Sequence, residues 1–169
     1  MERIIGIDIG LRNTGYGILD FNENTEKIVE GGVIKTNSKE NLDERLLTIF
    51  NDLDYVYKKY NPSITSMEDL HSRYRNLKTA IIMGHARGVA CAVASLNNAP
   101  VFHYQPTQIK NIVTGSGRAD KNQVIKTISN RLSSPNIKNE HVADAFASAI
   151  CHWVMSSSIK NICCIGAGF

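Results

Sequence analysis

The sequence predicts a single α/β domain built on a mixed β-sheet, and three observations lead to this fold class. With 169 residues, of which 43% are hydrophobic, the chain has the size of one domain with a real core. Three β-rich runs joined by short turns open the sequence, and helical patterns and further strands then alternate. No repeat, low-complexity tract or linker interrupts them. We therefore expect one domain over residues 1–158 and a C-terminal tail of unassigned role over residues 159–169.

The predicted strands fall into two groups. Consecutive strands with short connections pair as an antiparallel meander, which we expect for residues 3–9 (RIIGIDI), 15–20 (GYGILD) and 27–36 (KIVEGGVIKT). Two later runs follow helical patterns and complete the mixed sheet, residues 64–67 (ITSM) and 100–104 (PVFHY).

Apolar residues at helical spacing predict the remaining elements. The spacing predicts a helix from Leu42 to Tyr60, which the sequence Asn-Pro-Ser then ends. An Ala-rich helix is predicted over residues 77–96, and two more near residues 120–132 and 141–156. Pro106 is interpreted as a break after the fifth strand.

Composition argues against several protein classes. No window approaches 18 consecutive apolar residues, which disfavours a membrane span. Charged Glu2, Arg3 and Asp8 interrupt the first ten residues, where an export signal would be apolar. The four cysteines have neither a disulfide framework nor a zinc-binding spacing. We expect a soluble protein of the cytoplasm with no membrane partner and with reduced, structural thiols.

Positive charge is concentrated in the middle of the chain. Residues 1–70 contain eight Lys or Arg and thirteen Asp or Glu, whereas residues 71–138 contain ten Lys or Arg and one acid, Asp120. Because phosphate contacts by Lys and Arg supply most non-specific affinity for nucleic acids, this asymmetry favours a surface that faces a polyanion. Taken without the motifs, an ordinary solvated face explains it equally well.

Three acids stand in unusually apolar surroundings. Asp8 is predicted mid-strand in the first strand, Glu68 at the C-terminal end of the fourth, and Asp144 in the apolar helix HVADAFASAICHWV. Buried acids are costly unless they are paired or bound to metal. Hydrogen bonds to main-chain amides would account for Asp8 alone. Three such acids together favour a site for a hard cation.

That cluster has a matching chemistry. Oxygen ligands suit Mg²⁺ or Mn²⁺, and two such ions about 4 Å apart can activate a water and stabilise the leaving oxygen of an in-line phosphodiester displacement. His141 lies three residues before Asp144, and so on the same face of the helix. Binding of metal, proton transfer, orientation of a neighbour and a purely structural role all stay open for His141.

Four blocks of sequence carry a close resemblance to a known family. They are GIDIGLRNTGYGIL, SMEDLHSRYRNLKTAIIMGHARGVA, HYQPTQIKNIVTGSGRADKNQV and HVADAFASAICH, within residues 3–153. The chain resembles the RuvC family of Holliday junction resolvases. This implies a ribonuclease-H-like fold, whose five-stranded mixed sheet has three antiparallel and then two parallel strands flanked by helices. It also implies a homodimer that uses Mg²⁺ to make paired symmetric nicks in four-way DNA junctions during recombination and repair. Branch-migration helicases are possible partners, and a bacterial member would associate with the nucleoid.

The resemblance also assigns site residues. Asp8, Glu68 and Asp144 match the family's acids, and His141 falls where many members carry aspartate and some histidine. These four are the expected catalytic and metal-binding residues. The expected DNA-binding residues are Lys110 and Lys121 near the scissile phosphate and His71, Arg73, Tyr74, Arg75 and Lys78 on the junction face. Without the resemblance, exposed positions near helix starts account for both Lys110 and Lys121.

Some positions depart from the family or keep alternatives open. His71 stands where the family commonly has an aromatic residue that packs against unstacked bases at the junction, and Tyr74 follows three residues later, so either ring is a candidate. Arg87 either lines the junction face or braces helix packing. Gly84 and Gly88 indicate a close helix contact, with a second subunit or with the sheet.

Two other function classes compete with the nuclease. The segment DIGLRNTGYG also resembles the first phosphate loop of actin-like kinases, but that fold normally needs two larger lobes than this chain allows. A non-catalytic DNA-binding relative would not need three acids in apolar settings. We therefore favour the nuclease.

Overall fold

The computed structural model describes residues 1–23, 25–69 and 76–165. The DNA-binding candidates His71, Arg73, Tyr74 and Arg75 lie outside these residues. In chain order the elements are β1 (Glu2–Asp8), β2 (Asn13–Phe21), β3 (Glu26–Lys35), α1 (Leu42–Tyr60), β4 (Ile64–Glu68), α2 (Leu77–Leu96), β5 (Val101–Tyr104), α3 (Pro106–Thr114), α4 (Lys121–Arg131) and α5 (Glu140–Ile165).

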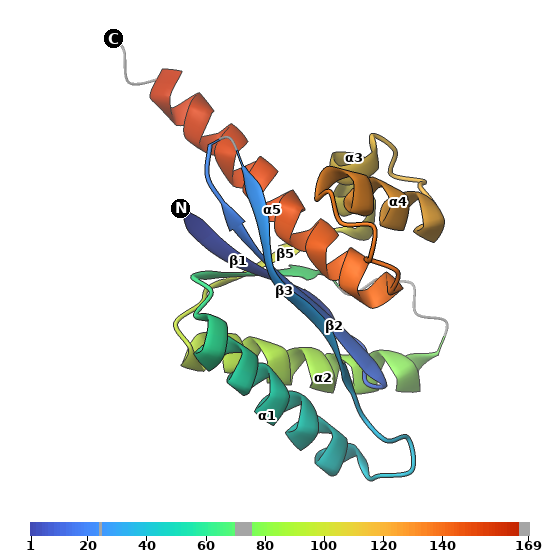
Figure 1. The fold of residues 1–169 in the computed structure, drawn as a ribbon. Helices are drawn as coiled ribbons and strands as arrows, with labels where there is room; N and C mark the ends of the chain where they lie inside the picture. Colours follow the sequence, from blue (N-terminus) through green and yellow to red (C-terminus); the bar gives the residue numbers. More distant parts are fainter. Residues whose placement is uncertain (24, 70–75, 166–169) are drawn as a thin grey trace.

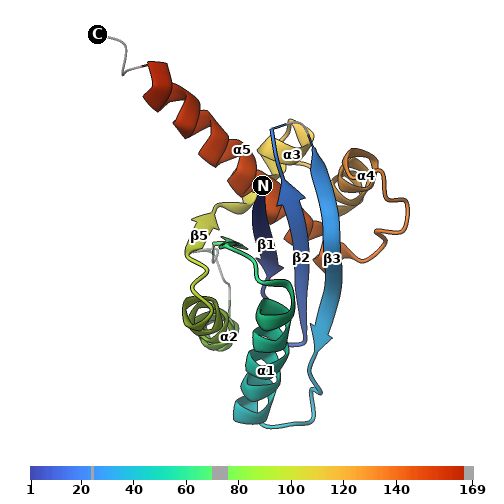
Figure 2. The ribbon, with the colours of Figure 1, turned by 60° about the vertical axis from the view of Figure 1, so that its left-hand side comes forward.

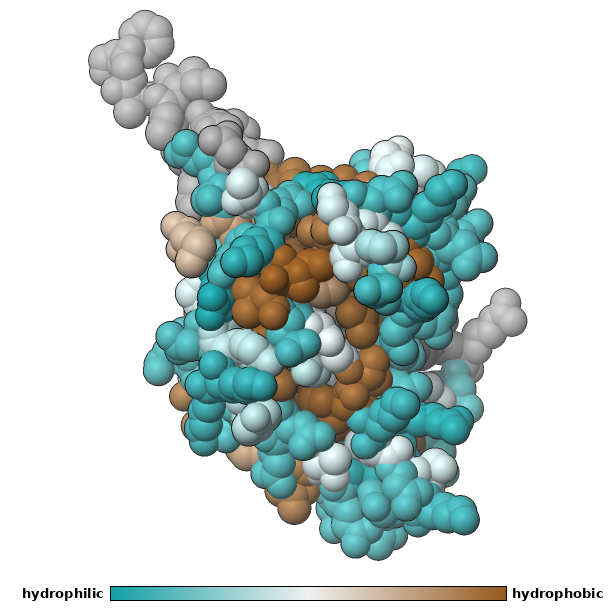
Figure 3. Space-filling view, in the orientation of Figure 1, coloured by the Kyte–Doolittle hydropathy of each residue, from teal (hydrophilic) through white to brown (hydrophobic). Residues whose placement is uncertain are grey.

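The strands form one mixed sheet in the order β3-β2-β1-β4-β5. The pairs β1–β2 and β2–β3 are antiparallel, and the pairs β1–β4 and β4–β5 are parallel. This confirms the predicted meander followed by two parallel strands. Strand β3 lies at one edge of the sheet. Figure 3 views the molecule from the side on which β3 lies and shows an apolar area in the middle, surrounded by hydrophilic residues.

Helices cover both faces of the sheet and make three layers (Figures 1 and 2). Helices α1 and α2 pack on one face, and α3, α4 and α5 lie on the other. Each face has its own buried apolar cluster. Because side chains alternate along a strand, Ile5 and Ile7 of β1 join the cluster under α1 and α2, whereas Ile4 faces α5. Asp8, four residues after Ile4, therefore also faces α5.

Helix α3 was not predicted, because Pro106 was taken as a break. The structure begins α3 at Pro106. Proline is favoured in the first turn of a helix, where its missing N–H and fixed φ carry no penalty, so here it marks a start. Helix α5 also runs past its predicted end near residue 156 to Ile165, across the proposed boundary between domain and tail.

Helix α2 combines an apolar composition with an exposed face. Among the described residues it is the one helix long and apolar enough to span a membrane by those two measures alone, with a mean hydropathy of 1.4 over an 18-residue window. Only 22% of that window is buried. Leu77 is 75% exposed and Ile81 53% exposed. A Cβ added at Gly84 or Gly88 would meet nothing within 4 Å, so these glycines do not contact the sheet.

Candidate active site

The three predicted acids come from three elements that meet at one edge of the sheet. Asp8 is the last residue of β1, rather than mid-strand as predicted, and Glu68 is the last residue of β4. The two strands run parallel side by side, with Ile7 opposite Met67. The carboxyl ends of neighbouring parallel strands lie at the same edge, which brings the two acids together. Helix α5 starts at Glu140 above this edge and carries Asp144 in its second turn.

Two glycines allow α5 to lie directly on the sheet. A Cβ at Gly6 would stand 1.8 Å from the main-chain oxygen of Ala145, and one at Gly15 would stand 2.2 Å from the main-chain oxygen of His141. Real Cβ atoms do not approach so closely, so only glycine fits at either position. Gly15 pairs with Asp8 across the β1–β2 ladder. The close contact therefore sets the start of α5 beside Asp8.

His141 is fixed against Asp8 by a hydrogen bond. The Nδ1 atom of His141 lies 2.7 Å from Asp8 Oδ2, and each side chain is about one quarter exposed. Because the carboxylate accepts from Nδ1–H, the Nε2 atom takes no part in this hydrogen bond. It lies 3.9 Å from Oε1 of Glu140. The arrangement suits orientation of Asp8, proton transfer and metal binding through Nε2.

Burial raises the pKa of each of the three acids, and the charge of Asp8 adds to the rise at Glu68 and Asp144, so full ionisation of the site is disfavoured. Burial, together with the charges of Asp8 and Asp144, raises the pKa of Glu68 to about 7. Burial and the charge of Asp8 raise the pKa of Asp144 to about 6. Burial also raises the pKa of Asp8, although the hydrogen bond from His141 opposes the shift. Several anionic groups in a partly dry site are stabilised by an added cation.

The donor set fits a hard divalent cation. No three His, Cys, Asp or Glu side chains of residues 1–23, 25–69 and 76–165 are close enough to enclose a metal ion between them. Mg²⁺ does not require such a cage, because it commonly binds one or two carboxylates and keeps waters or substrate phosphate oxygens as its other ligands.

Two of the predicted lysines lie near the acids. The charge of Lys110, from the unpredicted helix α3, lowers the pKa of Glu68 against the larger effect of burial. Lys121, in the first turn of α4, donates from Nζ to Oε2 of Glu140 at 2.7 Å. Its charge opposes the rise that burial causes in the pKa values of Asp8 and Asp144. Lys78 is exposed in the first turn of α2.

Sequence reasoning did not assign a role to several residues that build the site. Asn139 accepts from the main-chain N–H groups of His141 and Val142 and so caps the start of α5. Ser66 of β4 donates to the main-chain oxygen of Ser148 of α5 at 2.7 Å. The Asn just before the apolar helix was the available signal for the cap, whereas no local pattern marks the serine pair.

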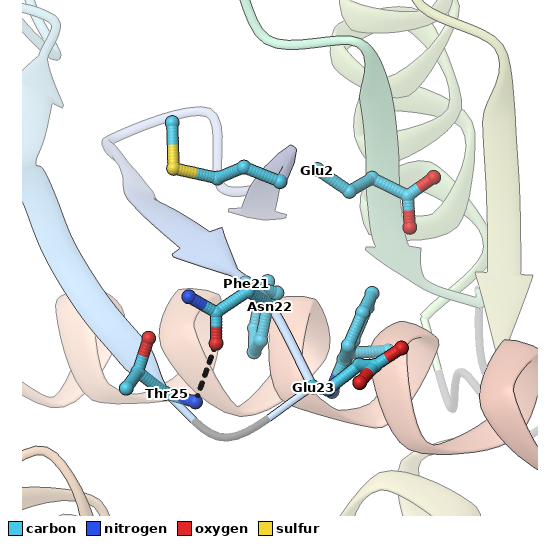
Figure 4. Close-up of a pocket in the computed structure, with 7 residues that line it drawn as sticks. Glu2, Phe21, Asn22, Glu23 and Thr25 are labelled. Atoms are coloured by element: carbon cyan, nitrogen blue, oxygen red, sulfur yellow. Dashed lines mark hydrogen bonds between the residues drawn. The ribbon is translucent and has the colours of Figure 1, made fainter.

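A large hollow lies elsewhere. Its volume is about 760 Å³, and Figure 4 shows its lining, which consists of Met1, Glu2, Phe21, Asn22, Glu23, Thr25 and Trp153. Glu2 begins the strand that Asp8 ends. At about 3.3 Å per residue, the hollow therefore lies about 20 Å from the acids, at the opposite edge of the sheet.

The five-stranded mixed sheet and its converging acids define a nuclease domain of the ribonuclease-H-like class. The model of the family described as crossover junction endodeoxyribonuclease RuvC matches residues 4–152. The RuvC of Alkaliphilus oremlandii is 45% identical over 152 residues, 88% of this chain and 91% of that protein. The RuvC of Wolbachia pipientis is 37% identical over 169 residues, 99% of each.

A solved structure agrees with these relatives. T. thermophilus RuvC in complex with Holliday junction substrate has a TM-score of 0.86 at 27% identity, over 92% of this chain and 95% of that one. The chain therefore belongs to the RuvC family and is a crossover junction endodeoxyribonuclease, a Holliday junction resolvase. This decides against the kinase and the non-catalytic DNA-binding protein.

Proposed function

We propose that Asp8, Glu68 and Asp144, with His141, form the cutting site of this resolvase and hold divalent metal there. The observation that carries the proposal is the convergence of three carboxylates, from β1, β4 and α5, whose pKa values are raised by burial and, at Glu68 and Asp144, by the charge of Asp8 as well. Such a set is unfavourable without a cation and suited to one. Mg²⁺ is the proposed ion, two per site, with Mn²⁺ as a substitute. When bound, the ions would activate a water and stabilise the leaving oxygen.

His141 orients Asp8 in this proposal. Its Nδ1–H holds Oδ2, so the other carboxylate oxygen is free to face the metal. Its Nε2 atom remains available as a ligand or for proton transfer. Asp8, His141 and Asp144 thus act together because the first turns of α5 lie against the end of β1.

Lys110 and Lys121 are the proposed phosphate contacts beside the cut. Lys110 is close enough to Glu68, and Lys121 to Asp144, to lower the pKa of that acid. A lysine that contacts the scissile phosphate must lie near the acids in the same way. Lys121 exchanges Glu140 for the DNA phosphate on binding. We propose that Lys78 and, outside the described residues, His71, Arg73, Tyr74 and Arg75 contact the arms or the unpaired bases of the four-way junction.

We propose that the enzyme acts as a homodimer through the exposed face of α2. Leu77, Ile81, Gly84 and Gly88 follow one another at spacings of four, three and four residues and so share a face of the helix. The first two are exposed apolar side chains, and the two glycines leave open space in which another backbone can approach closely. A two-fold junction needs two sites, which a two-fold dimer supplies. Sedimentation velocity of Gly88→Arg tests the proposal, because an unchanged dimer would contradict it.

Cleavage of a mobile four-way junction tests the cutting site. The wild-type protein with Mg²⁺ should make paired symmetric nicks on the junction and leave a linear duplex and a flap largely intact. Asp8→Asn should abolish the nicks and keep junction binding, measured by fluorescence anisotropy in Ca²⁺. Equal cutting of all three DNAs would contradict junction selectivity. Nicking by Asp8→Asn would contradict the metal site.

Two expectations of the resemblance remain proposals. We propose branch-migration helicases as functional partners, since a resolvase acts on a junction that other enzymes move. The cytoplasm, with association to the nucleoid in a bacterium, is the proposed location because the substrate is cellular DNA.

A further inference from the structure

Arg87 lies within α2 and reaches the end of β4 that carries Glu68. The Arg87 side chain is only 13% exposed. Its Nη1 donates to the main-chain oxygen of Glu68, and its Nη2 donates to Asp69 Oδ1 at 3.0 Å. Nη2 also lies 2.6 Å from Nδ1 of His103. Arginine carries no acceptor, so this His103 nitrogen must be the unprotonated one and accept.

The same contacts tie the end of β4 to its neighbours. Glu68 is the last residue of β4, and the pairing with β1 ends one residue earlier, at Met67. Asp69 is held from β5 as well, because its N–H donates to the oxygen of Tyr104 at 2.8 Å and its Oδ2 accepts from Gln105 Nε2 at 3.1 Å. One guanidinium thus joins α2 and β5 to the end of β4, where the pairing with β1 has ended.

We propose that Arg87 is a positioning residue for DNA cleavage, which holds the main chain at Glu68 and Asp69 so that the Glu68 carboxylate stays beside Asp8 and Asp144. The inference rests on the proposed function, in which Glu68 binds metal. Groups that orient a metal ligand affect metal affinity and rate without touching the metal. Both carboxylate-bearing strand ends are then braced, Asp8 by His141 and Glu68 through its main chain by Arg87.

The contacts argue against the first role predicted for Arg87, on the junction face, and give the second, as a brace, a more specific target at the end of β4. A residue that lines the junction face would expose its guanidinium, whereas this one is nearly enclosed. Packing alone would not require a buried cation, which is stable here because carbonyl, carboxylate and imidazole acceptors surround it. The planar fork of arginine spans these acceptors, and the single ammonium of lysine does not.

Arg87→Lys tests the proposal while it keeps the charge. Mn²⁺ affinity of the DNA-free protein, from calorimetry, and the Mg²⁺ concentration for half-maximal single-turnover cleavage should both worsen by about tenfold or more. Junction affinity in Ca²⁺ should change less than twofold. His103→Ala removes one acceptor from an exposed position and should move both metal readouts in the same direction. It carries the test if Arg87→Lys does not fold.

The controls separate this inference from the proposed function. Arg131→Lys alters another paired arginine, bound to Glu26 through Nε at 2.8 Å, and should leave both metal readouts unchanged. Metal dependence like that of the wild type in Arg87→Lys would overturn the positioning role. If Arg87→Lys does not fold, the same result in His103→Ala would overturn it. A loss confined to junction binding would also overturn it. Glu68→Gln tests the proposed function itself. If that variant binds Mn²⁺ and cuts normally, the metal site is wrong, whatever Arg87→Lys shows.

Discussion

Ser66 and Ser148 join the strand that carries Glu68 to the helix that carries Asp144, two of the proposed catalytic acids. Their Oγ atoms are 2.9 Å apart in the buried layer between β4 and α5, and Ser66 Oγ also lies 2.7 Å from the main-chain oxygen of Ser148. Ser66 lies two residues before Glu68, and Ser148 lies one helical turn after Asp144, so each serine shares the face of its acid. The pair therefore sets how β4 and α5 face each other below the site.

Ser66→Ala should impair both folding and cutting. It leaves the Ser148 hydroxyl buried without this partner, at a cost of about 1–3 kcal/mol in the free energy of unfolding. Cleavage should slow, because α5 is less well fixed against β4. Ser63→Ala is the matched control, since Ser63 Oγ donates to the oxygen of Arg3 at 3.0 Å at the other end of β4. Urea unfolding and single-turnover assays measure the two effects, and equal losses in both variants would contradict the idea.

Gly15→Ala should push the start of α5 away from the sheet. The added methyl would stand 2.2 Å from the His141 main-chain oxygen, a severe steric overlap, and so the His141–Asp8 hydrogen bond should be lost. We expect a destabilisation of about 2 kcal/mol or more and a marked loss of cleavage. Thermal unfolding and the junction assay check this. A variant with normal stability and rate would show that α5 can shift without harm.

The metal-free enzyme should become less stable as the pH rises from about 4.5 to 7. The folded-state pKa of Glu68 is raised from 4.5 to about 7, so the folded protein holds this proton more tightly than the unfolded chain. The stabilising effect of the bound proton is complete below pH 4.5 and is lost as the pH approaches 7. At pH 8 in EDTA, Glu68→Gln should therefore be more stable than wild type, by on the order of 1 kcal/mol.

Calorimetric melting at pH 5 and pH 8 measures this effect. The advantage of Glu68→Gln should shrink at pH 5 and should also shrink at pH 8 when MgCl₂ is added, because the ion compensates the wild-type carboxylates. Glu40→Gln, at an exposed position before α1, is the control. An advantage that does not depend on pH would have another cause.

Lys121→Ala should weaken junction binding and reduce its salt dependence. Loss of one phosphate contact lowers the slope of log K against log salt by about one unit. Lys126→Ala removes an exposed lysine from the same helix and should have a smaller effect. Anisotropy titrations across a range of salt concentrations give both slopes. An unchanged slope in Lys121→Ala would return Lys121 to the ordinary solvated surface.

His141→Asp should retain more activity than His141→Ala. Aspartate at position 141 provides an oxygen ligand near Asp8. Alanine provides no ligand and leaves Oδ2 of Asp8 without its hydrogen bond from position 141. The test is the cleavage rate over a wide range of Mg²⁺ concentrations. A full rate for His141→Ala at every concentration would make the histidine purely structural.

Local sequence determined most of the fold. The bounds of α1 and α2 agree with the predicted 42–60 and 77–96, because helical periodicity and end signals act within a few residues. The meander followed from short turns. Pro106 misled the prediction, since the same residue can end one element or begin the next, and only the packing of α3 on α5 selects the second.

The sequence by itself also determined which side chains are the candidates for the site, because acids in apolar stretches and the family's four blocks are visible along the chain. Their supports were decided by tertiary structure. Ser66 meets Ser148 across 82 residues, Lys121 meets Glu140 across 19, and Arg87 meets Asp69 across 18. No local pattern encodes such pairs. They form because α2 packs on one face of the sheet while α5, with α4 beside it, packs on the other, where Gly6 and Gly15 admit close approach. That packing exists only in the folded chain.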